Sequence, residues 1–173
     1  VTLAGGSVNV PVEEQYIADG YALVSDGEGY SVLTEEAVAD YMAYITGKDG
    51  TVVYYETLQA AVDAAVDGDV ITVLKDITTS GTLIANSASK PLSAEITVDL
   101  NGKTITSTNS LSPVFQVYPT KNFTLTSSDG RGTVKADYAA LIRAINCESA
   151  DVLIENIDFS GTVKSFDPLT FNT

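Results

Sequence analysis

Carboxylates dominate the side chains of this sequence that could carry out chemistry. The 173 residues include 23 Asp and Glu, a single cysteine, Cys147, and no histidine. Without histidine, neither a Ser-His-Asp nor a Cys-His arrangement can form, and histidine-ligated metal sites are excluded. A single cysteine also excludes an internal disulfide and a structural cysteine-zinc site. The remaining chemistry is that of paired carboxylates, which hydrolyse glycosidic bonds when they are held at a suitable separation.

The two arginines, Arg131 and Arg143, are the other groups that could act in catalysis. Neither lies in a basic cluster, and no acidic motif accompanies Arg143. We therefore interpret Arg143 as a solvent-facing or structurally paired side chain. Cys147 ends a predicted strand that starts at Leu141, where a small buried apolar residue is the simpler interpretation.

Three acidic turns could be considered as calcium ligands: Asp26-Gly27-Glu28, Asp67-Gly68-Asp69 and Ser128-Asp129-Gly130. None matches the twelve-residue calcium loop or the repeated glycine-aspartate nonapeptide. Asp-Gly is also favourable turn chemistry by itself. We predict no metal site and no cofactor.

Tyrosine is the residue type best suited to binding a partner in this sequence, which contains nine tyrosines and no tryptophan. Tyr118 and Tyr138 lie in or near predicted turns, from which side chains can project into solvent. A tyrosine ring gives contact area and its hydroxyl gives a hydrogen bond. These two residues are the candidate ligand-binding positions, with ordinary partial burial as the alternative.

A helix that feeds directly into a buried strand is the first element expected to position these groups. Leu58, Ala61, Val62, Ala65 and Val66 form one apolar stripe at helical spacing. Thr57 is a suitable N-cap, and Gly68 is a suitable left-handed stop. We predict a helix over residues 57–67 that covers one end of an apolar core.

Short apolar segments recur along the rest of the chain at a nearly regular spacing. One track contains Ile71, Ile96, Phe123 and Val152, a second contains Ile105, Val134 and Phe159, and a third contains Val114 and Leu141. Three short strands per repeat of roughly 25 to 29 residues are typical of a parallel β-helix. We therefore expect the residues of the first track to fill one interior column of stacked strands.

An antiparallel sandwich is the alternative fold. Asp99-Leu-Asn-Gly-Lys-Thr-Ile105 has the Asn-Gly pair that is typical of a two-residue type I′ hairpin. The solenoid is favoured because the spacing recurs on three tracks together.

Three segments of the chain resemble a known family of domains. They are Tyr55-Glu-Thr-Leu-Gln-Ala-Ala-Val-Asp-Ala-Ala, Gly68-Asp-Val-Ile-Thr-Val-Leu-Lys-Asp76 and Ile96-Thr-Val-Asp-Leu-Asn-Gly-Lys-Thr-Ile105. They resemble the opening of right-handed parallel β-helix domains, similar to pectate lyases, in large surface proteins of Gram-positive gut and oral bacteria. The resemblance covers roughly residues 50 to 160 and implies a capping helix at the mouth of the solenoid and a cell-surface setting. The motifs of the pectin-degrading hydrolases, Asn-Thr-Asp, Asp-Asp, Gly-His-Gly and Arg-Ile-Lys, do not occur here.

The first fifty residues contain Gly-Gly, Tyr-x-x-x-Gly-Tyr and Asp-Gly-x-x-Tyr-x-Val signatures, which resemble the segment that closes one such unit before the next begins. We expect a short helix from Pro11 to Gly20 and a hairpin of residues 21–25 and 30–33. Residues 34–46 fit either a helix or a strand. We favour a short helix to about Asp40, followed by a hairpin of residues 42–46 and 51–55.

The net charge of −14 disfavours a nucleic-acid partner, which requires a basic face. No apolar run is long enough to span a membrane. The prediction is thus a mainly β chain with a small α+β junction over residues 1–46 and a right-handed parallel β-helix over residues 47–173, whose C-terminus we expect to be truncated.

The functional expectation is a non-catalytic, secreted or wall-anchored module that binds a host or environmental macromolecule. The resemblance to adhesin-like surface proteins makes a host glycoprotein or an immunoglobulin the expected partner class. We expect a monomeric module within a tandem array. A β-helix enzyme acting on polysaccharides, a carbohydrate-binding module and a structural spacer are the alternatives.

Overall fold

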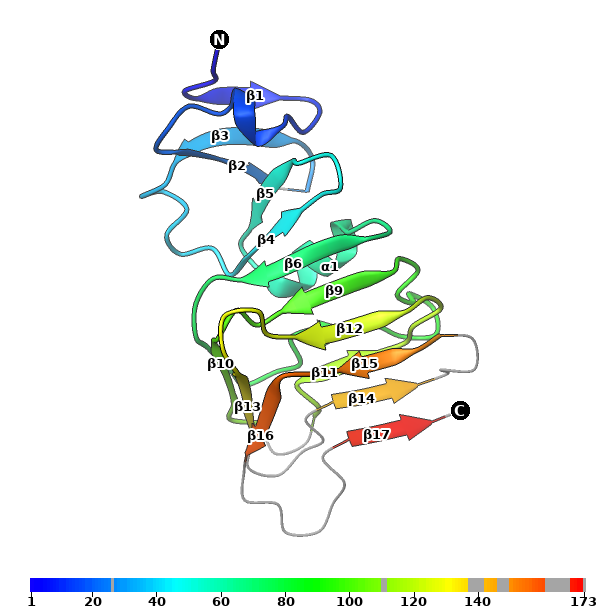
Figure 1. Cartoon of the computed structure of the whole chain (residues 1–173). Coiled ribbons are helices and arrows are strands. Elements are labelled where there is room, and N and C mark those ends of the chain that lie inside the picture. The colour runs from blue at the N-terminus through cyan, green and yellow to red at the C-terminus, as the bar shows by residue number, and fades with distance from the viewer. Residues whose placement is uncertain (26, 110–111, 137–141, 146–149, 161–168, 173) are drawn as a thin grey trace.

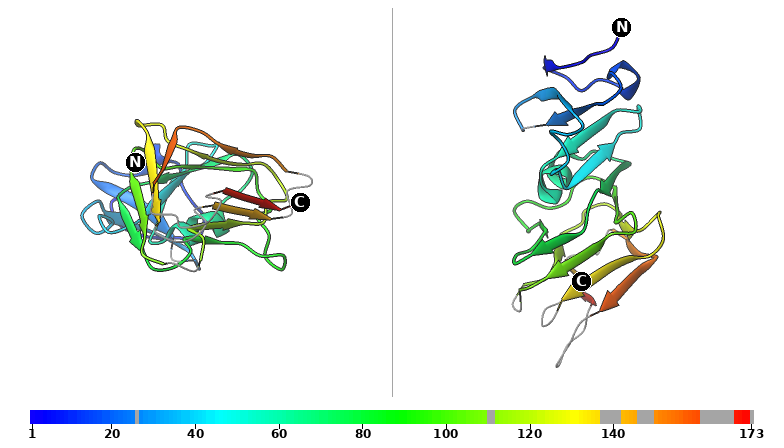
Figure 2. Two further views of the ribbon diagram at one scale, coloured as in Figure 1. Left: turned by 90° about the horizontal axis from the view of Figure 1, so that it is seen from below. Right: turned by 90° about the vertical axis from the view of Figure 1, so that its left-hand side faces the viewer.

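Three β-sheets wind around one apolar interior in the computed structural model of the chain (Figure 1). The structure describes all residues except 26, 110–111, 137–141, 146–149, 161–168 and 173. The N-terminus and the C-terminus lie at opposite ends of the stack (Figures 1 and 2). The predicted fold class, a mainly β chain built as a parallel β-helix, is confirmed.

Each turn of the solenoid contributes one strand to each sheet. The first sheet contains β6 (Asp69–Val73), β9 (Ile96–Asp99), β12 (Phe123–Thr126) and β15 (Val152–Ile154). The second contains β7 (Ile77–Thr79), β10 (Thr104–Ser107), β13 (Gly132–Ala136) and β16 (Ile157–Ser160). The third contains β8 (Ile84–Ala85), β11 (Phe115–Val117), β14 (Ile142–Ile145) and β17 (Leu169–Asn172). All pairs between successive turns are parallel.

The first predicted column is correct for three residues and wrong for Ile71. Ile96, Phe123 and Val152 are in register on neighbouring strands, but Ile96 stands opposite Asp69. Ile71 instead starts the neighbouring column, which continues through Val98, Leu125 and Ile154.

A shift of two residues explains this error. Because side chains alternate between the two faces of a strand, a two-residue shift keeps every apolar side chain on the interior face. The apolar-Thr-apolar pattern therefore cannot distinguish the two registers. The connection decides between them, because the Gly68 amide donates to the Glu95 carbonyl at 2.7 Å and so sets Asp69 beside Ile96.

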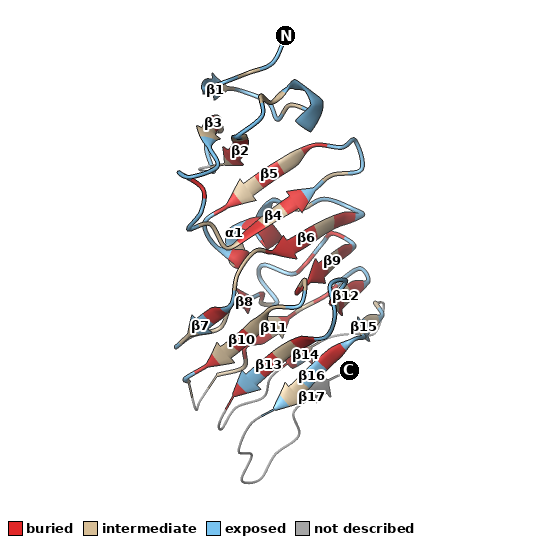
Figure 3. Cartoon of the chain, turned by 60° about the vertical axis from the view of Figure 1, so that its left-hand side comes forward, coloured by how far each residue is buried: buried red, intermediate tan, exposed pale blue. Residues whose placement is uncertain are grey.

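The second track agrees with the predicted stacking. Ile105 stands opposite Val134, and Val134 stands opposite Phe159. In the third sheet Phe115 stands opposite Ile142, which is the same offset along the chain as that predicted for Val114 and Leu141, although Leu141 lies outside the described residues. Phe115 and Phe123 are fully buried. A buried side chain of this size contributes roughly 1.5–3 kcal/mol, and buried positions alternate with more exposed ones along most strands (Figure 3).

The Asn101-Gly102 pair forms a tight turn without making a hairpin. Both residues have positive φ, 50° and 72°, and the Lys103 amide donates to the Leu100 carbonyl at 2.8 Å. The flanking strands β9 and β10 nevertheless belong to different sheets. The local turn chemistry was thus recognised correctly, but the turn makes a corner of the solenoid, and the antiparallel alternative is wrong.

The N-terminal part extends the first sheet with strands that pair mostly antiparallel. It contains β1 (Gly6–Val8), β2 (Tyr21–Ser25), β3 (Tyr30–Thr34), β4 (Ala43–Thr46) and β5 (Val52–Tyr55), in the sheet order β1-β3-β2-β5-β4-β6. The predicted hairpins β2–β3 and β4–β5 are both present. Because β4 also pairs with β6, the hydrogen-bonded sheet runs without interruption across the predicted boundary at residues 46–47.

Two short helices predicted in this part are not formed as such. From Pro11 to Gly20 the chain makes only a 3-10 turn, η1 (Glu14–Tyr16), because neighbouring backbone groups bond to distant segments: the Leu3 amide donates to Tyr16 and the Glu14 amide donates to Gly50. From Thr34 to Asp40 the chain forms successive hydrogen-bonded turns, which bury Val38, rather than a helix.

Helix α1 (Leu58–Ala64) covers the first turn of the solenoid (Figure 1). Its N-cap is Thr57, as predicted, and Leu58, Ala61 and Val62 are buried in the main core. The helix ends three residues earlier than predicted, so Val66 is 65% exposed instead of buried. The chain leaves the helix because the Asp69 carboxylate accepts the Val66 amide at 2.9 Å and closes a turn.

The first prediction tests the solenoid corner. A Cβ atom on Gly102 would lie 2.2 Å from the Asp129 carbonyl oxygen, whereas a Cβ on Gly130 would meet no atom within 4 Å, although the two φ angles are nearly equal. We expect Gly130→Ala to cost about 1–2 kcal/mol for the left-handed backbone alone, and Gly102→Ala to cost clearly more. Denaturant unfolding of both variants measures the difference. Equal losses would show that the corner is not tightly packed.

The second prediction tests the helix as a cap. Val62 is 4% exposed, and Val62→Asp should lower the free energy of unfolding by more than about 3 kcal/mol, because it buries an unpaired charge. The matched variant Val66→Asp, at an exposed position, should stay within about 0.5 kcal/mol. Thermal and denaturant melts check both values. Similar stability of the two variants would exclude the capping role.

Candidate functional site

The structure does not bring the predicted binding residues together. Tyr118 follows β11 and is only half-buried, and its carbonyl accepts the Leu92 amide at 2.8 Å, so its backbone helps to order the third side of the solenoid. Tyr138 lies outside the described residues, as does Cys147. Arg143 is exposed on β14, in register with Gln116 and Thr170.

A buried carboxylate joins two turns of the solenoid at the corner between the first and second sheets. Asp99, which is 7% exposed, accepts hydrogen bonds from the Asn101 amide, the Ser128 amide and the Ser128 hydroxyl. One turn further along, the Asn156 amide side chain donates to the carbonyls of Ser127 and Gly130. These bonds join successive turns, so the Asp99 carboxylate is used to hold the fold.

The Asp67-Gly68-Asp69 turn also has a structural role. Asp67 accepts the Glu95 amide at 2.9 Å and pairs with Lys121, whose hydrogen bond is the main cause of the lowered pKa of Asp67. Asp69 accepts the Val66 amide. Arg131 similarly pairs with Asp158 at 2.5 Å, which lowers the pKa of that carboxyl. Within the described residues, no group of three or more Asp, Glu, His or Cys is placed to hold a metal ion.

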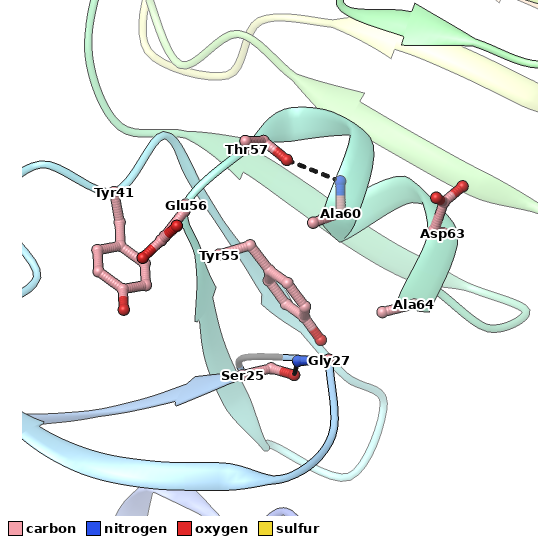
Figure 4. A pocket seen from close by; sticks show the side chains of 9 residues that line it. All are labelled: Ser25, Gly27, Tyr41, Tyr55, Glu56, Thr57, Ala60, Asp63 and Ala64. Carbon is pink, nitrogen blue, oxygen red and sulfur yellow. Dashed lines mark hydrogen bonds between the residues drawn. The ribbon is translucent and has the colours of Figure 1, made fainter.

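A cavity of about 520 Å³ lies where the N-terminal hairpins meet helix α1 (Figure 4). We call it the cap cavity. Its lining comes from three segments: the end of β2 with Gly27 just beyond it, the residue Tyr41 before β4, and the run from the end of β5 through α1. The lining residues are Ser25, Gly27, Tyr41, Tyr55, Glu56, Thr57, Ala60, Asp63 and Ala64.

The cap cavity begins where the pairing of two strands stops. The parallel ladder between β2 and β5 consists of a single pair, Val24 with Tyr54. The next residue on each strand, Ser25 and Tyr55, lines the cavity. The cavity is therefore a wedge between the end of that pairing and the capping helix.

Tyr55 forms the buried wall of this wedge. It is 6% exposed, and burial raises its pKa to about 12, with smaller contributions from Tyr30 and Asp69. Tyr55 also lines a second cavity of about 190 Å³ on the side of Pro11, Tyr30 and Asp69. Its hydroxyl therefore stays protonated at neutral pH and can donate a hydrogen bond.

The two carboxylates of the cap cavity differ in their surroundings. Asp63 pairs with Lys90 at 2.6 Å and accepts a hydrogen bond from Gln59, and in Figure 4 it points away from the tyrosines. Glu56 is exposed and points to the side of Tyr41. No hydrogen bond or ion pair joins the Glu56 carboxylate to another residue in the described part of the chain. Among the described residues that line this cavity, Glu56 thus has a carboxylate charge without a partner.

Sequence reasoning did not find the cap cavity. The sequence analysis assigns no binding role to Tyr41, Tyr55 or Glu56. The sequence feature that points to Glu56 is the predicted N-cap at Thr57. A residue just before a helix that covers the end of the core lies at the edge of that end. The N-cap does not indicate which residues of the other two segments lie beside Glu56.

Comparison with protein families, with curated proteins and with solved structures found no match. In the described residues, no helix has the length and apolar character needed to cross a membrane. The strand pairing and helix α1 define the chain as a parallel β-helix that is capped by antiparallel hairpins and one helix.

The third prediction follows from the raised pKa of Tyr55. The pKa of Tyr55 is about 12 in the folded chain and about 10 in the unfolded chain. The protonated side chain therefore makes its full contribution to the free energy of unfolding below pH 10. That contribution is lost as the pH rises from 10 through 12. Denaturant unfolding between pH 8 and pH 12 should show a smaller alkaline loss for Tyr55→Phe than for the unchanged chain. Tyr16→Phe, at a residue that is 49% exposed, is the control and should follow the unchanged chain. An identical alkaline loss for Tyr55→Phe would contradict the assignment.

Proposed function

We propose that this chain is a non-catalytic β-helical module of a bacterial surface protein, and that it binds a host or environmental macromolecule at its capped end. The observation that supports this most is the cavity at the cap, which is lined by residues from three separate segments of the chain. On the wall, the carboxylates Asp67, Asp99 and Asp158 are engaged in bonds that join turns or pair with nearby cations. At the cap, an open cavity is lined by two tyrosines and by Glu56, whose carboxylate has no partner among the described residues.

A binding role needs a rigid platform more than a reactive group. The cap cavity is framed by β5, which pairs with β4, and by α1, whose apolar stripe is buried in the core. The lining residues from Tyr55 to Ala64 are therefore held by strand pairing and core packing, which lowers the entropic cost of binding. The net charge of −14 supports a partner that is neutral or basic and opposes an acidic glycan at low salt.

The setting of the module rests on the sequence resemblance. That resemblance implies a secreted or wall-anchored protein of a Gram-positive bacterium, with host glycoproteins or immunoglobulins as the partner class. A structural spacer is the second candidate, and the regular in-register stack of β6, β9, β12 and β15 favours it.

The fourth prediction tests binding against the other functions. We expect the purified chain to bind saturably to one member of an immobilised panel of secretory immunoglobulins and mucin-type glycoproteins, measured by biolayer interferometry. Reducing-end and unsaturated-product assays over a panel of polysaccharides, with and without calcium, should show no turnover.

The outcomes separate three functions. Turnover that is abolished by substituting a single Asp, Glu or Arg143 would identify an enzyme. Absence of both turnover and binding would leave the spacer. Binding that persists when the chain is thermally unfolded would be non-specific adsorption and would contradict the proposal.

A further inference from the structure

The cap cavity has the size and accessibility of a ligand site. Its volume of about 520 Å³ falls within the roughly 300–1,000 Å³ that small-ligand sites occupy. Thr57, Ala60 and Ala64 on its helical side are exposed, so the cavity opens to solvent. Their small side chains leave room for a side chain of a partner to enter along the helix.

The charged residues among its lining are both acidic. Glu56 and Asp63 are these residues, and Lys90 already neutralises Asp63. Among the described lining residues, Glu56 therefore supplies the negative charge that no cation neutralises, within a chain whose net charge is −14. An anionic group would be repelled here, and a neutral group would leave the Glu56 charge without a partner.

Aromatic rings accompany this carboxylate. Tyr41 is half-buried, packs against Ala22, Val24 and Val38, and lies on the same side of the cavity as Glu56 (Figure 4). Tyr55 forms the inner wall, and its protonated hydroxyl is directed toward Ser25 and Gly27 in the same view. A ring beside a carboxylate is suited to a flat cation, which stacks on the ring and donates hydrogen bonds to the oxygens.

We propose that the cap cavity binds an arginine side chain of a partner protein. The guanidinium stacks on Tyr41 and donates to the Glu56 carboxylate, while its aliphatic stem lies along Ala60 and Ala64. Arginine fits better than lysine because a planar fork can stack and donate at the same time, which a compact ammonium cannot do. This inference deepens the proposed function and rests on it for the identity of the partner class.

The test uses short peptides and the full chain. Binding of acetyl-Gly-Arg-Gly-amide is followed by amide chemical shifts in NMR, with two matched probes in which arginine is replaced by citrulline or by lysine. Citrulline keeps the planar shape and removes the charge. We expect the arginine peptide to bind about tenfold more tightly than the citrulline peptide and more tightly than the lysine peptide, with shifts centred on residues 55–64. Raising the salt concentration should weaken the arginine peptide selectively.

Variants assign the contacts. Glu56→Gln and Tyr41→Leu should each weaken the arginine peptide by about tenfold, whereas Tyr41→Phe should keep its affinity because the ring is retained. Glu155→Gln removes an equal charge at an exposed position on the fourth turn and should have no effect. Thermal melts of all four variants confirm that they are folded.

Several results would overturn the arginine site. These are equal binding of the citrulline peptide, equal weakening by Glu155→Gln, or unchanged binding in Glu56→Gln. A neutral oligosaccharide whose binding disappears in Tyr41→Leu would reassign the cavity to carbohydrate. If a macromolecular partner binds with the same affinity to Glu56→Gln, this inference fails while the proposed function stands. If the arginine peptide depends on Glu56 but no macromolecule binds, the proposed function fails and the site remains.

Discussion

Parallel hydrogen bonding between successive turns is the constraint on which the rest of this structure depends. Each strand of the first sheet repeats the strand before it at a nearly constant spacing along the chain, so one register fixes which side chains share an interior column. Interior columns such as Ile71, Val98 and Leu125 then fill the space between the three sheets. The same constraint leaves open backbone groups and an open core at the first turn. The Gln59 side chain accepts the Ala85 amide at the edge of β8, and α1 covers the core above it.

The corners show how the stack is held where strand pairing stops. A parallel solenoid changes direction several times in each turn, and the buried polar groups at each change need partners. Asp99 and Asn156 meet this need with side-chain bonds that cross from one turn to the next. Gly102 allows the close approach, because its missing Cβ leaves room for the Asp129 carbonyl. The acidic composition is thus partly structural, and a carboxylate on the wall is not by itself a sign of acid-base chemistry.

The periodic features of this fold could be predicted from the sequence. Features that depend on contacts between segments far apart in the sequence could not. The repeat spacing and the inside-outside alternation predicted the three sheets, because both are local properties of short strands. The same alternation does not distinguish registers that differ by two residues, so the sequence predicts the wrong column for Ile71. The register is set by the bond between the Gly68 amide and the Glu95 carbonyl, which lies outside the repeat pattern. Helix α1 was predicted too long because Val66 continues the apolar stripe. The turn closed by Asp69 competes with that stripe and prevails.

The cap cavity also depends on contacts between distant segments. It indicates where a β-helix can acquire a specific binding site. Along the wall each turn repeats the parallel strand pairing of the turn before it. At the cap the strand direction reverses, because β4 pairs antiparallel with β6, whereas β6 pairs parallel with β9. The chain then has to join hairpins to a solenoid, and β2 meets β5 through only one residue pair. Ser25, Tyr41 and Glu56 come from segments with no common motif, yet they line one wedge because regular pairing ends there. A concave site therefore arises at the place where the repeat is broken, and its specificity is encoded in residues that no repeat pattern contains.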